Sequence, residues 1–194
     1  MNVEQLLDKL RELIGENTFL SIKNAFLMAE NAHKKQFNHC GEPYICHPLR
    51  LCIILADELN INDSNSISIA LLHDVVEKTD TTIEDIKALF GDKIAEGVAL
   101  LTKSDHYEGD IDKQKQYFVL LKKASKKIQM IKLADRLDKL RDIETCDDEI
   151  IKRKFIMDTS YNYLSWAKEI RPYIAAEYED LIFKYRDKLG DYTL

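Results

Sequence analysis

Apolar side chains recur at helical spacing along almost the whole chain. In residues 3–14 they return every three to four positions, which places them on one face of a helix. Thr18 is expected to cap a second helix that ends near Phe37, and Pro48 to lie in the first turn of a third. The predicted helices cover residues 3–14, 18–37, 48–59, 66–78, 81–91, 92–101, 113–124, 126–143, 147–170 and 172–188.

No segment alternates apolar and polar residues over the length of a strand. The 194 residues include six Gly and three Pro, which is little punctuation for a many-stranded fold. The pattern therefore predicts an all-α fold, a single domain of about ten helices. Residues 103–113 are polar and contain a glycine, so they are the expected mobile loop; the sequence does not decide whether they close over a site.

One apolar run, Ile67–Val76, contains an adjacent His73 and Asp74. The run predicts a buried helix that continues to about Lys78, where a carboxylate is costly unless something pairs with it. A divalent metal would remove that cost. His47 and Asp135 complete a plausible set of four ligands, and mixed imidazole and carboxylate ligands suit manganese, iron(II) or zinc. Such a site can activate water and polarise a phosphoryl oxygen.

Glu77 and Lys78, which follow the His-Asp pair, are spaced so that their side chains could reach the same site. Glu77 follows His73 by four positions, so both project from one helix face, and Glu77 would be the general acid or base. The competing interpretation is a surface glutamate. Lys78 follows Asp74 by four, and would either pair with it or reach a substrate phosphate.

The spacing around Asp135 is less specific. Asp135, Asp138, Lys139 and Asp142 form a polar stripe on a predicted helix, and spacing alone favours an ordinary solvated face with internal ion pairs. His33 lies in an apolar helical segment and is expected to be a core or capping histidine rather than a ligand.

Composition excludes several classes of function. A net charge of −6 disfavours a general nucleic-acid binder, although a local basic pocket for a small anion remains compatible. No apolar run is long enough for a membrane span, and the charged, amphipathic N-terminus is not a signal peptide. The four cysteines form no Cys-x-x-Cys pair, so free thiols in the cytoplasm are expected. The sequence does not predict the oligomeric state.

Three segments resemble a known family. AHKKQFNHCGEPYICHPLRLCIILADEL, ALLHDVVEKTDTTIEDIKALFGDKIAEGVALLTK and IKLADRLDKLRDI are similar to the hydrolase domain of the RelA/SpoT alarmone enzymes, a branch of the HD superfamily. The resemblance covers residues 25–145, and residues 146–194 are expected to add C-terminal helices to one HD domain spanning 1–194. No synthetase domain is expected after these segments, so the chain is expected to resemble the small stand-alone alarmone hydrolases.

The resemblance implies a helical HD fold that holds a metal, usually manganese, with the four ligands proposed above. It implies a small nucleotide substrate, and removal of the 3′-pyrophosphate from ppGpp or pppGpp by metal-activated water. Glu77 matches a residue thought to assist that water, and Tyr44 lies in the matched GEPY segment beside the pocket.

The chain departs from the family at positions expected to contact substrate. Asn38 and His39 replace an Arg-Lys pair whose arginine is associated with stacking on guanine, and asparagine has no guanidinium plane. Lys78 replaces an aspartate, and Asp138-Lys139 replaces His-Asn. The substrate would then be ppGpp or another nucleotide, such as an adenine alarmone or a phosphorylated cofactor. The added lysines are also compatible with a protein that holds a nucleotide without cleaving it. The predicted substrate-binding residues are Asn38, His39, Tyr44, Lys78 and Lys139.

Overall fold

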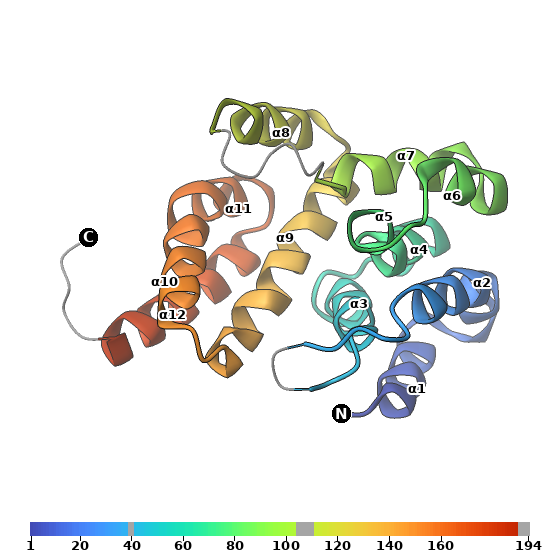
Figure 1. Cartoon of the computed structure of the whole chain (residues 1–194), viewed down its shortest axis with the longest axis horizontal. Helices are drawn as coiled ribbons and strands as arrows, with labels where there is room; N and C mark the ends of the chain where they lie inside the picture. The colour runs from blue at the N-terminus through green and yellow to red at the C-terminus, as the bar shows by residue number, and fades with distance from the viewer. Residues whose placement is uncertain (39–40, 104–110, 190–194) are drawn as a thin grey trace. The chain divides into compact units, whose positions relative to one another are not determined.

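The computed structural model describes residues 1–38, 41–103 and 111–189 of the chain. Its helices are shown in Figure 1. The chain divides into two units, residues 1–131 and residues 132–194. Within the described residues the regular structure is helical, apart from one isolated antiparallel bridge between Phe37 and Pro43. The all-α class is therefore confirmed, while the organisation as one domain stays a prediction. Among the described helices, none combines the length and the apolar character needed to cross a membrane.

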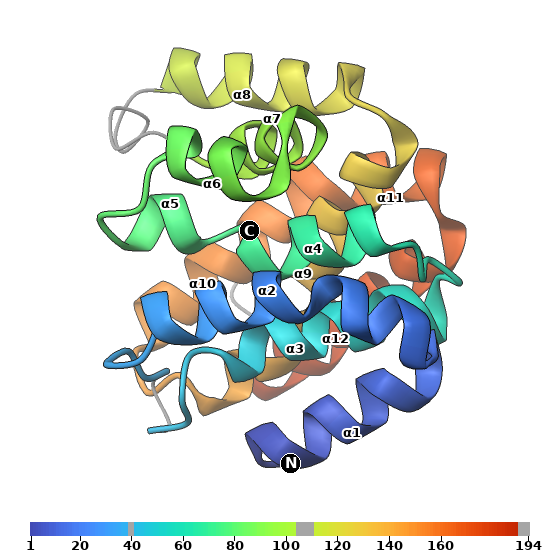
Figure 2. The same cartoon turned by 90° about the vertical axis from the view of Figure 1, so that its right-hand side faces the viewer.

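The first unit is built around α4, which packs against both α2 and α7 (Figure 2). Every residue of α4 from Ser66 to Leu72 is buried, as expected for a helix that is apolar all round. The helices of this unit are α1 (Val3–Ile14), α2 (Glu16–Ala32), α3 (Cys46–Ile53), the π-helix η1 (Ile54–Glu58), α4 (Ser64–Leu72), α5 (Val75–Lys78), α6 (Ile83–Phe90), α7 (Asp92–Leu101), α8 (Ile111–Lys123) and the start of α9 (Lys126–Asp142).

Local sequence signals account for several helix ends. Asn2 caps α1 in a capping box with Gln5, and Thr82 does the same for α6 with Asp85. Gly91 ends α6 with φ of 80°, a backbone conformation that other residues rarely adopt. The predicted segments 3–14 and 92–101 agree with α1 and α7, and the predicted end of α6 at Gly91 is confirmed.

The prediction for α2 was wrong at both ends. The helix begins at Glu16 rather than Thr18, because Gly15 with φ of 77° already separates it from α1. It ends at Ala32 rather than Phe37. Beyond His33 the chain folds into a hairpin, in which backbone hydrogen bonds join residues 36–38 to residues 42–44.

The predicted continuous helix from residue 66 to Lys78 was also wrong. It breaks into α4 and α5, and His73 and Asp74 form the turn between them. Asp74 has φ of −99° and ψ of −5°, in the bridge region that turn residues often occupy. The two adjacent side chains are therefore not arranged as consecutive residues of one helix.

The second unit contains the rest of α9 and the C-terminal helices. The predicted helix over residues 147–170 is interrupted by a π-helical turn, so that segment forms two α-helices. After α9 come the 3₁₀ turn η3 (Ile143–Thr145), α10 (Glu149–Asp158), the π-helix η4 (Thr159–Tyr163), α11 (Leu164–Ile170) and α12 (Pro172–Leu189).

The buried Arg136 joins α9 to the π-helical turn. Its guanidinium donates to the hydroxyl of Thr159 at 2.8 Å and to the carbonyl of Phe155 at 2.7 Å. It also pairs with the Asp158 carboxylate at 2.8 Å, and it lies 3.6 Å from the ring centroid of Phe155 and 4.4 Å from that of Tyr163. Arg136 therefore fixes the chain where α10 gives way to η4.

Candidate metal centre

Three of the predicted ligands converge within the first unit. His47 lies in the first turn of α3, and His73 and Asp74 form the turn between α4 and α5. The Nε2 atoms of the two histidines are 3.3 Å apart. Asp74 brings Oδ1 to 3.2 Å from Nε2 of His73 and Oδ2 to 3.8 Å from Nε2 of His47. All three residues are buried, with exposures of 6%, 2% and 4% in chain order.

The end of α4 orients His73. Its Nδ1 lies 2.8 Å from the carbonyl oxygen of Ala70, in the last turn of that helix, where carbonyls lack an intrahelical partner. A carbonyl only accepts hydrogen bonds, so Nδ1 carries the proton and Nε2 presents a lone pair. This is the arrangement of a histidine that binds a metal through Nε2.

The donor set fits a divalent cation. A neutral imidazole nitrogen and a carboxylate placed within about 4 Å of each other, and removed from water, are ligands of the type that manganese, iron(II) and zinc accept. The buried carboxylate of Asp74 also needs a positive partner to offset the cost of leaving water. The residues present in the first unit could therefore contribute three ligands to one metal.

Tyr44, predicted to contact substrate, instead contacts a candidate ligand. Its hydroxyl donates a hydrogen bond to Oδ2 of Asp74. Its ring lies 5.8 Å from that of His47 and 4.8 Å from that of His33, and the Lys78 ammonium is 5.4 Å from its centroid. A role for Tyr44 in substrate binding stays a prediction, but its hydroxyl is engaged by Asp74.

Gln36 has a role in the structure that its sequence pattern did not indicate. Its side-chain nitrogen donates to the Lys78 carbonyl at 2.8 Å, and its side-chain oxygen lies 2.8 Å from Nδ1 of His33. His33 caps the end of α2 and is 2% exposed, as expected for a core or capping histidine. Burial lowers its pKa below the usual value, although the hydrogen bond to Gln36 acts in the opposite direction. The spacing of His33 and Gln36 gave no signal of the long-range bond to residue 78.

The hairpin that precedes His47 places Asn38 opposite Glu42. The Asn38 side chain accepts from the Glu42 backbone N–H at 2.9 Å and donates to the Glu42 carboxylate at 3.1 Å. Arg50 pairs with the same carboxylate at 2.6 Å. These contacts give Asn38 a structural role in the hairpin, and its predicted contact with substrate is untested. His39 lies outside the described residues.

Glu77 does not share a helix face with His73 as predicted, because the helix is broken between them. The Glu77 carboxylate accepts a hydrogen bond from the Lys103 backbone N–H at 2.9 Å, just beyond the end of α7. Glu77 is half-buried and Lys78 is exposed. The predicted catalytic role of Glu77 and the phosphate-binding role of Lys78 stay predictions.

In the second unit, Asp135 is buried and is held by two lysines on the same helix. The Lys132 ammonium lies 3.0 Å from its Oδ2, and the Lys139 ammonium lies 2.7 Å from its Oδ1. Asp135 is 2% exposed, so the polar stripe expected from spacing alone is not a solvated face at this position. Lys139, predicted to bind substrate, pairs with a candidate metal ligand.

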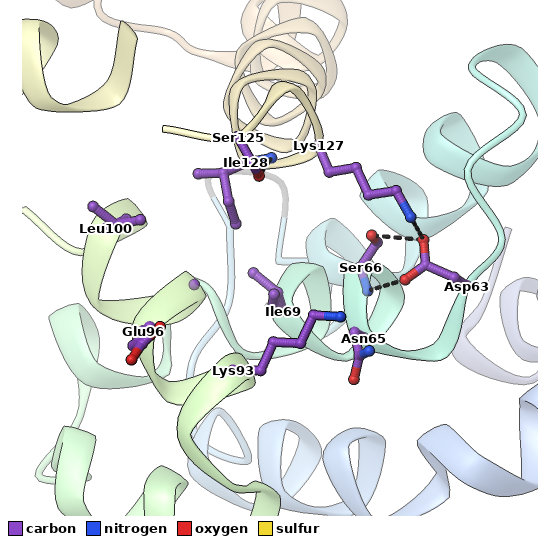
Figure 3. A pocket seen from close by; sticks show the side chains of 11 residues that line it. Asp63, Asn65, Ser66, Ile69, Lys93, Glu96, Leu100, Ser125, Lys127 and Ile128 are labelled. Carbon is purple, nitrogen blue, oxygen red and sulfur yellow. Dashed lines mark hydrogen bonds and ion pairs between the residues drawn. The ribbon is translucent and has the colours of Figure 1, made fainter. Parts of the chain in front are cut away.

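A separate cavity of about 260 Å³ in the first unit involves none of the predicted site residues (Figure 3). It lies beside the start of α4, where Asp63 caps the helix and pairs with Lys127 at 2.7 Å. Ile69 and Ile128 form part of its apolar lining, next to Gly97. A Cβ at Gly97 would lie 2.4 Å from Ile69 Cδ1, so glycine allows the helices to approach here.

A helical fold with a buried His-Asp pair in the turn after a buried helix is the arrangement expected of an HD domain. The chain belongs to the HD domain family, which matches residues 25–163. Its fold is similar to the solved structure of a metazoan ortholog of SpoT that hydrolyzes ppGpp. The TM-score is 0.76 at 25% identity, covering 85% of this chain and 95% of that one.

Two named pyrophosphohydrolases are similar to this chain in sequence. The guanosine-3′,5′-bis(diphosphate) 3′-pyrophosphohydrolase MESH1 of Xenopus tropicalis is 34% identical over 77% of this chain and 82% of its own length. The guanosine-3′,5′-bis(diphosphate) 3′-pyrophosphohydrolase of Aquifex aeolicus is 35% identical over 84% of this chain. The chain spans only 24% of the length of the Aquifex protein. The resemblance to SpoT-type hydrolases is therefore confirmed, including to a relative of similar length.

Proposed function

We propose that this protein is a metal-dependent phosphohydrolase that removes the 3′-pyrophosphate from ppGpp, pppGpp or a related alarmone nucleotide. The observation that carries the proposal is the convergence of His47, His73 and Asp74 in a chain related to named pyrophosphohydrolases. The reaction on ppGpp consumes one water and yields GDP and pyrophosphate. A nucleotide is thus the proposed partner, and manganese is the proposed cofactor.

Asp135 is proposed as the fourth ligand. Its side chain is buried in the second unit, a carboxylate is a ligand that manganese accepts, and its segment is one of the three that resemble the HD hydrolases. When bound, a divalent metal lowers the pKa of a coordinated water and polarises a phosphoryl oxygen. The fixed tautomer of His73 keeps its Nε2 lone pair available as a ligand.

Glu77 is proposed to move a proton to or from the attacking water. Its carboxylate accepts one hydrogen bond from the Lys103 N–H, which leaves further acceptor capacity on its oxygens. Lys78 is exposed and could contact a substrate phosphate, since its ammonium is a mobile point charge on a flexible chain. The loss of the family arginine at Asn38 is expected to weaken preference for guanine.

A hydrolysis screen tests the proposal. Manganese-loaded protein is incubated with guanine and adenine alarmones and with phosphorylated dinucleotides, and mass spectrometry identifies the products. We expect pyrophosphate release from ppGpp or a related alarmone. His73→Ala should abolish both hydrolysis and manganese content, whereas Lys87→Ala, at an exposed lysine of α6, should preserve both. Full manganese content in purified His73→Ala protein would contradict the assigned ligand.

A second function is supported by one observation. Lys132 and Lys139 both pair with Asp135, so two positive charges already compensate this carboxylate. A protein that binds a nucleotide without cleaving it would be compatible with that arrangement. Nucleotide binding by calorimetry, with no turnover of any nucleotide in the screen, would favour this function over hydrolysis.

A further inference from the structure

Tyr44 joins the GEPY segment to a candidate metal ligand. Its hydroxyl donates to Oδ2 of Asp74, while Oδ1 of Asp74 lies 3.2 Å from Nε2 of His73. A carboxylate that accepts a hydrogen bond on one oxygen is restrained in orientation, and such partners of metal ligands tune affinity for the metal. The phenol is therefore placed to determine which oxygen of Asp74 is directed toward His73.

Tyr44 is itself held by neighbouring residues of the hairpin and of α2. Its backbone N–H donates to the Gln36 carbonyl at 2.9 Å. Its ring packs against His33, with the ring centroids 4.8 Å apart and the planes inclined at 46°. A hydrogen bond therefore holds the Tyr44 backbone, and the His33 ring packs against the phenol. Both contacts restrain the direction of the hydroxyl.

The side chain of Gln36 connects this arrangement to α5. Its nitrogen donates to the Lys78 carbonyl, which can only accept, so its oxygen is directed toward Nδ1 of His33. Nδ1 of His33 therefore donates to Gln36, which fixes the tautomer and the plane of the ring beside Tyr44. Two of these contacts join positions far apart in sequence, 42 residues for Gln36 and Lys78, and 30 for Tyr44 and Asp74.

We infer that Tyr44 is a positioning residue for Asp74, and that Gln36 and His33 hold Tyr44 in place. This role rests on the proposed metal site. It assigns Tyr44 to the orientation of a metal ligand instead of the substrate contact predicted from the sequence. Removal of a hydrogen-bonding partner of a metal ligand typically weakens metal binding by about 10- to 100-fold. Tyr44→Phe keeps the ring between its neighbours and removes only the hydroxyl.

Manganese binding to the chelator-treated full chain, measured by isothermal titration calorimetry, is the decisive measurement. We expect Tyr44→Phe to weaken manganese affinity by about 10- to 100-fold. At saturating manganese, the KM of this variant for ppGpp, or for the substrate found in the screen, should equal that of the wild type. Gln36→Leu should weaken manganese affinity in the same direction but less, because the hydroxyl of Tyr44 remains.

Tyr117→Phe is the matched control, because it also removes one buried phenol hydrogen bond, to the Leu101 carbonyl at 2.7 Å. It should lower the Tm and leave manganese affinity unchanged. Each variant is first compared by circular dichroism, so that lost affinity is not mistaken for lost folding.

Two results would overturn the inference. If folded Tyr44→Phe binds manganese as tightly as the wild type, the hydroxyl does not position Asp74. If its affinity is unchanged while the nucleotide KM rises, Tyr44 is a substrate contact. Wild-type protein that binds no manganese would instead remove the proposed metal site, and this inference with it. In the first two cases the proposed function survives.

Discussion

Arg136 offers the sharpest test of how the second unit is held together. Its side chain is 8% exposed and it makes two hydrogen bonds, to Thr159 and to the Phe155 carbonyl. The perturbation is Arg136→Met, which keeps an unbranched side chain of similar length and removes the charge and all donors. Arg141→Met on the same helix is the control, since Arg141 pairs with Glu177 and both side chains are 32% exposed.

The expected loss of folding free energy follows from the contacts that each substitution removes. Each hydrogen bond from a charged donor contributes about 1.5–3 kcal/mol, and a cation–π contact contributes about 0.5–2 kcal/mol. The ion pair with Asp158, whose side chain is 39% exposed, adds little. Relief of the buried guanidinium's desolvation offsets part of this loss. We expect a net destabilisation of about 3 kcal/mol for Arg136→Met, against less than about 1 kcal/mol for Arg141→Met.

Urea denaturation followed by circular dichroism measures both variants. With an m-value of about 1–3 kcal/mol/M, a loss of about 3 kcal/mol lowers the midpoint by at least about 1 M. Two transitions in the wild type, one for each unit, would assign the shift to the later part of the chain directly. Equal midpoint shifts for the two variants, or a shift of Arg136→Met within about 0.3 M of zero, would refute the reasoning.

Two further predictions concern the candidate site. Lys139→Asn should strengthen manganese binding about fivefold in calorimetry, because the Lys139 ammonium, whose side chain is 34% exposed, no longer competes for Asp135 in an ion pair worth about 1 kcal/mol; unchanged affinity would show that the pair does not compete. Burial lowers the pKa of His33 below its usual 6.5, so His33 is protonated at a higher pH in the unfolded chain than in the folded one. The stability contributed by neutral His33 is therefore fully present above pH 6.5 and is lost as the pH falls through the lowered pKa. In chelator, the Tm of wild type should fall more steeply from pH 8 to 5 than that of His33→Gln; parallel curves would exclude this contribution.

Local signals in the sequence predicted most helices correctly. The capping residues of α6 and the glycine after it are adjacent in sequence to the helix they delimit, so their effect could be read directly. The burial of α4 was equally evident, because the stretch from Ile67 to Leu72 is apolar apart from Ser68. These features depend on neighbours within one or two turns.

The errors fall where distant residues decide the local conformation. α2 ends at Ala32, and beyond it the Gln36 side chain donates to the Lys78 carbonyl while the Gln36 carbonyl accepts from the Tyr44 N–H. No periodicity in the sequence reveals these contacts. The break at His73 is hidden inside an apolar run that reads as one helix. The candidate ligands were predicted from their residue types and from the buried His-Asp run, and the resemblance implied the same set, whereas the hydrogen bond from Tyr44 to Asp74 required the structure.

The end of α4 has a consequence for how the site tolerates mutation. The group that orients His73 is the backbone carbonyl of Ala70, and every residue type at position 70 supplies the same carbonyl. Asp74 instead accepts its hydrogen bond from a side chain, the phenol of Tyr44, which one substitution removes. The two adjacent candidate ligands therefore differ in mutational robustness. Sequence drift around the site should erode the orientation of the carboxylate well before that of the imidazole.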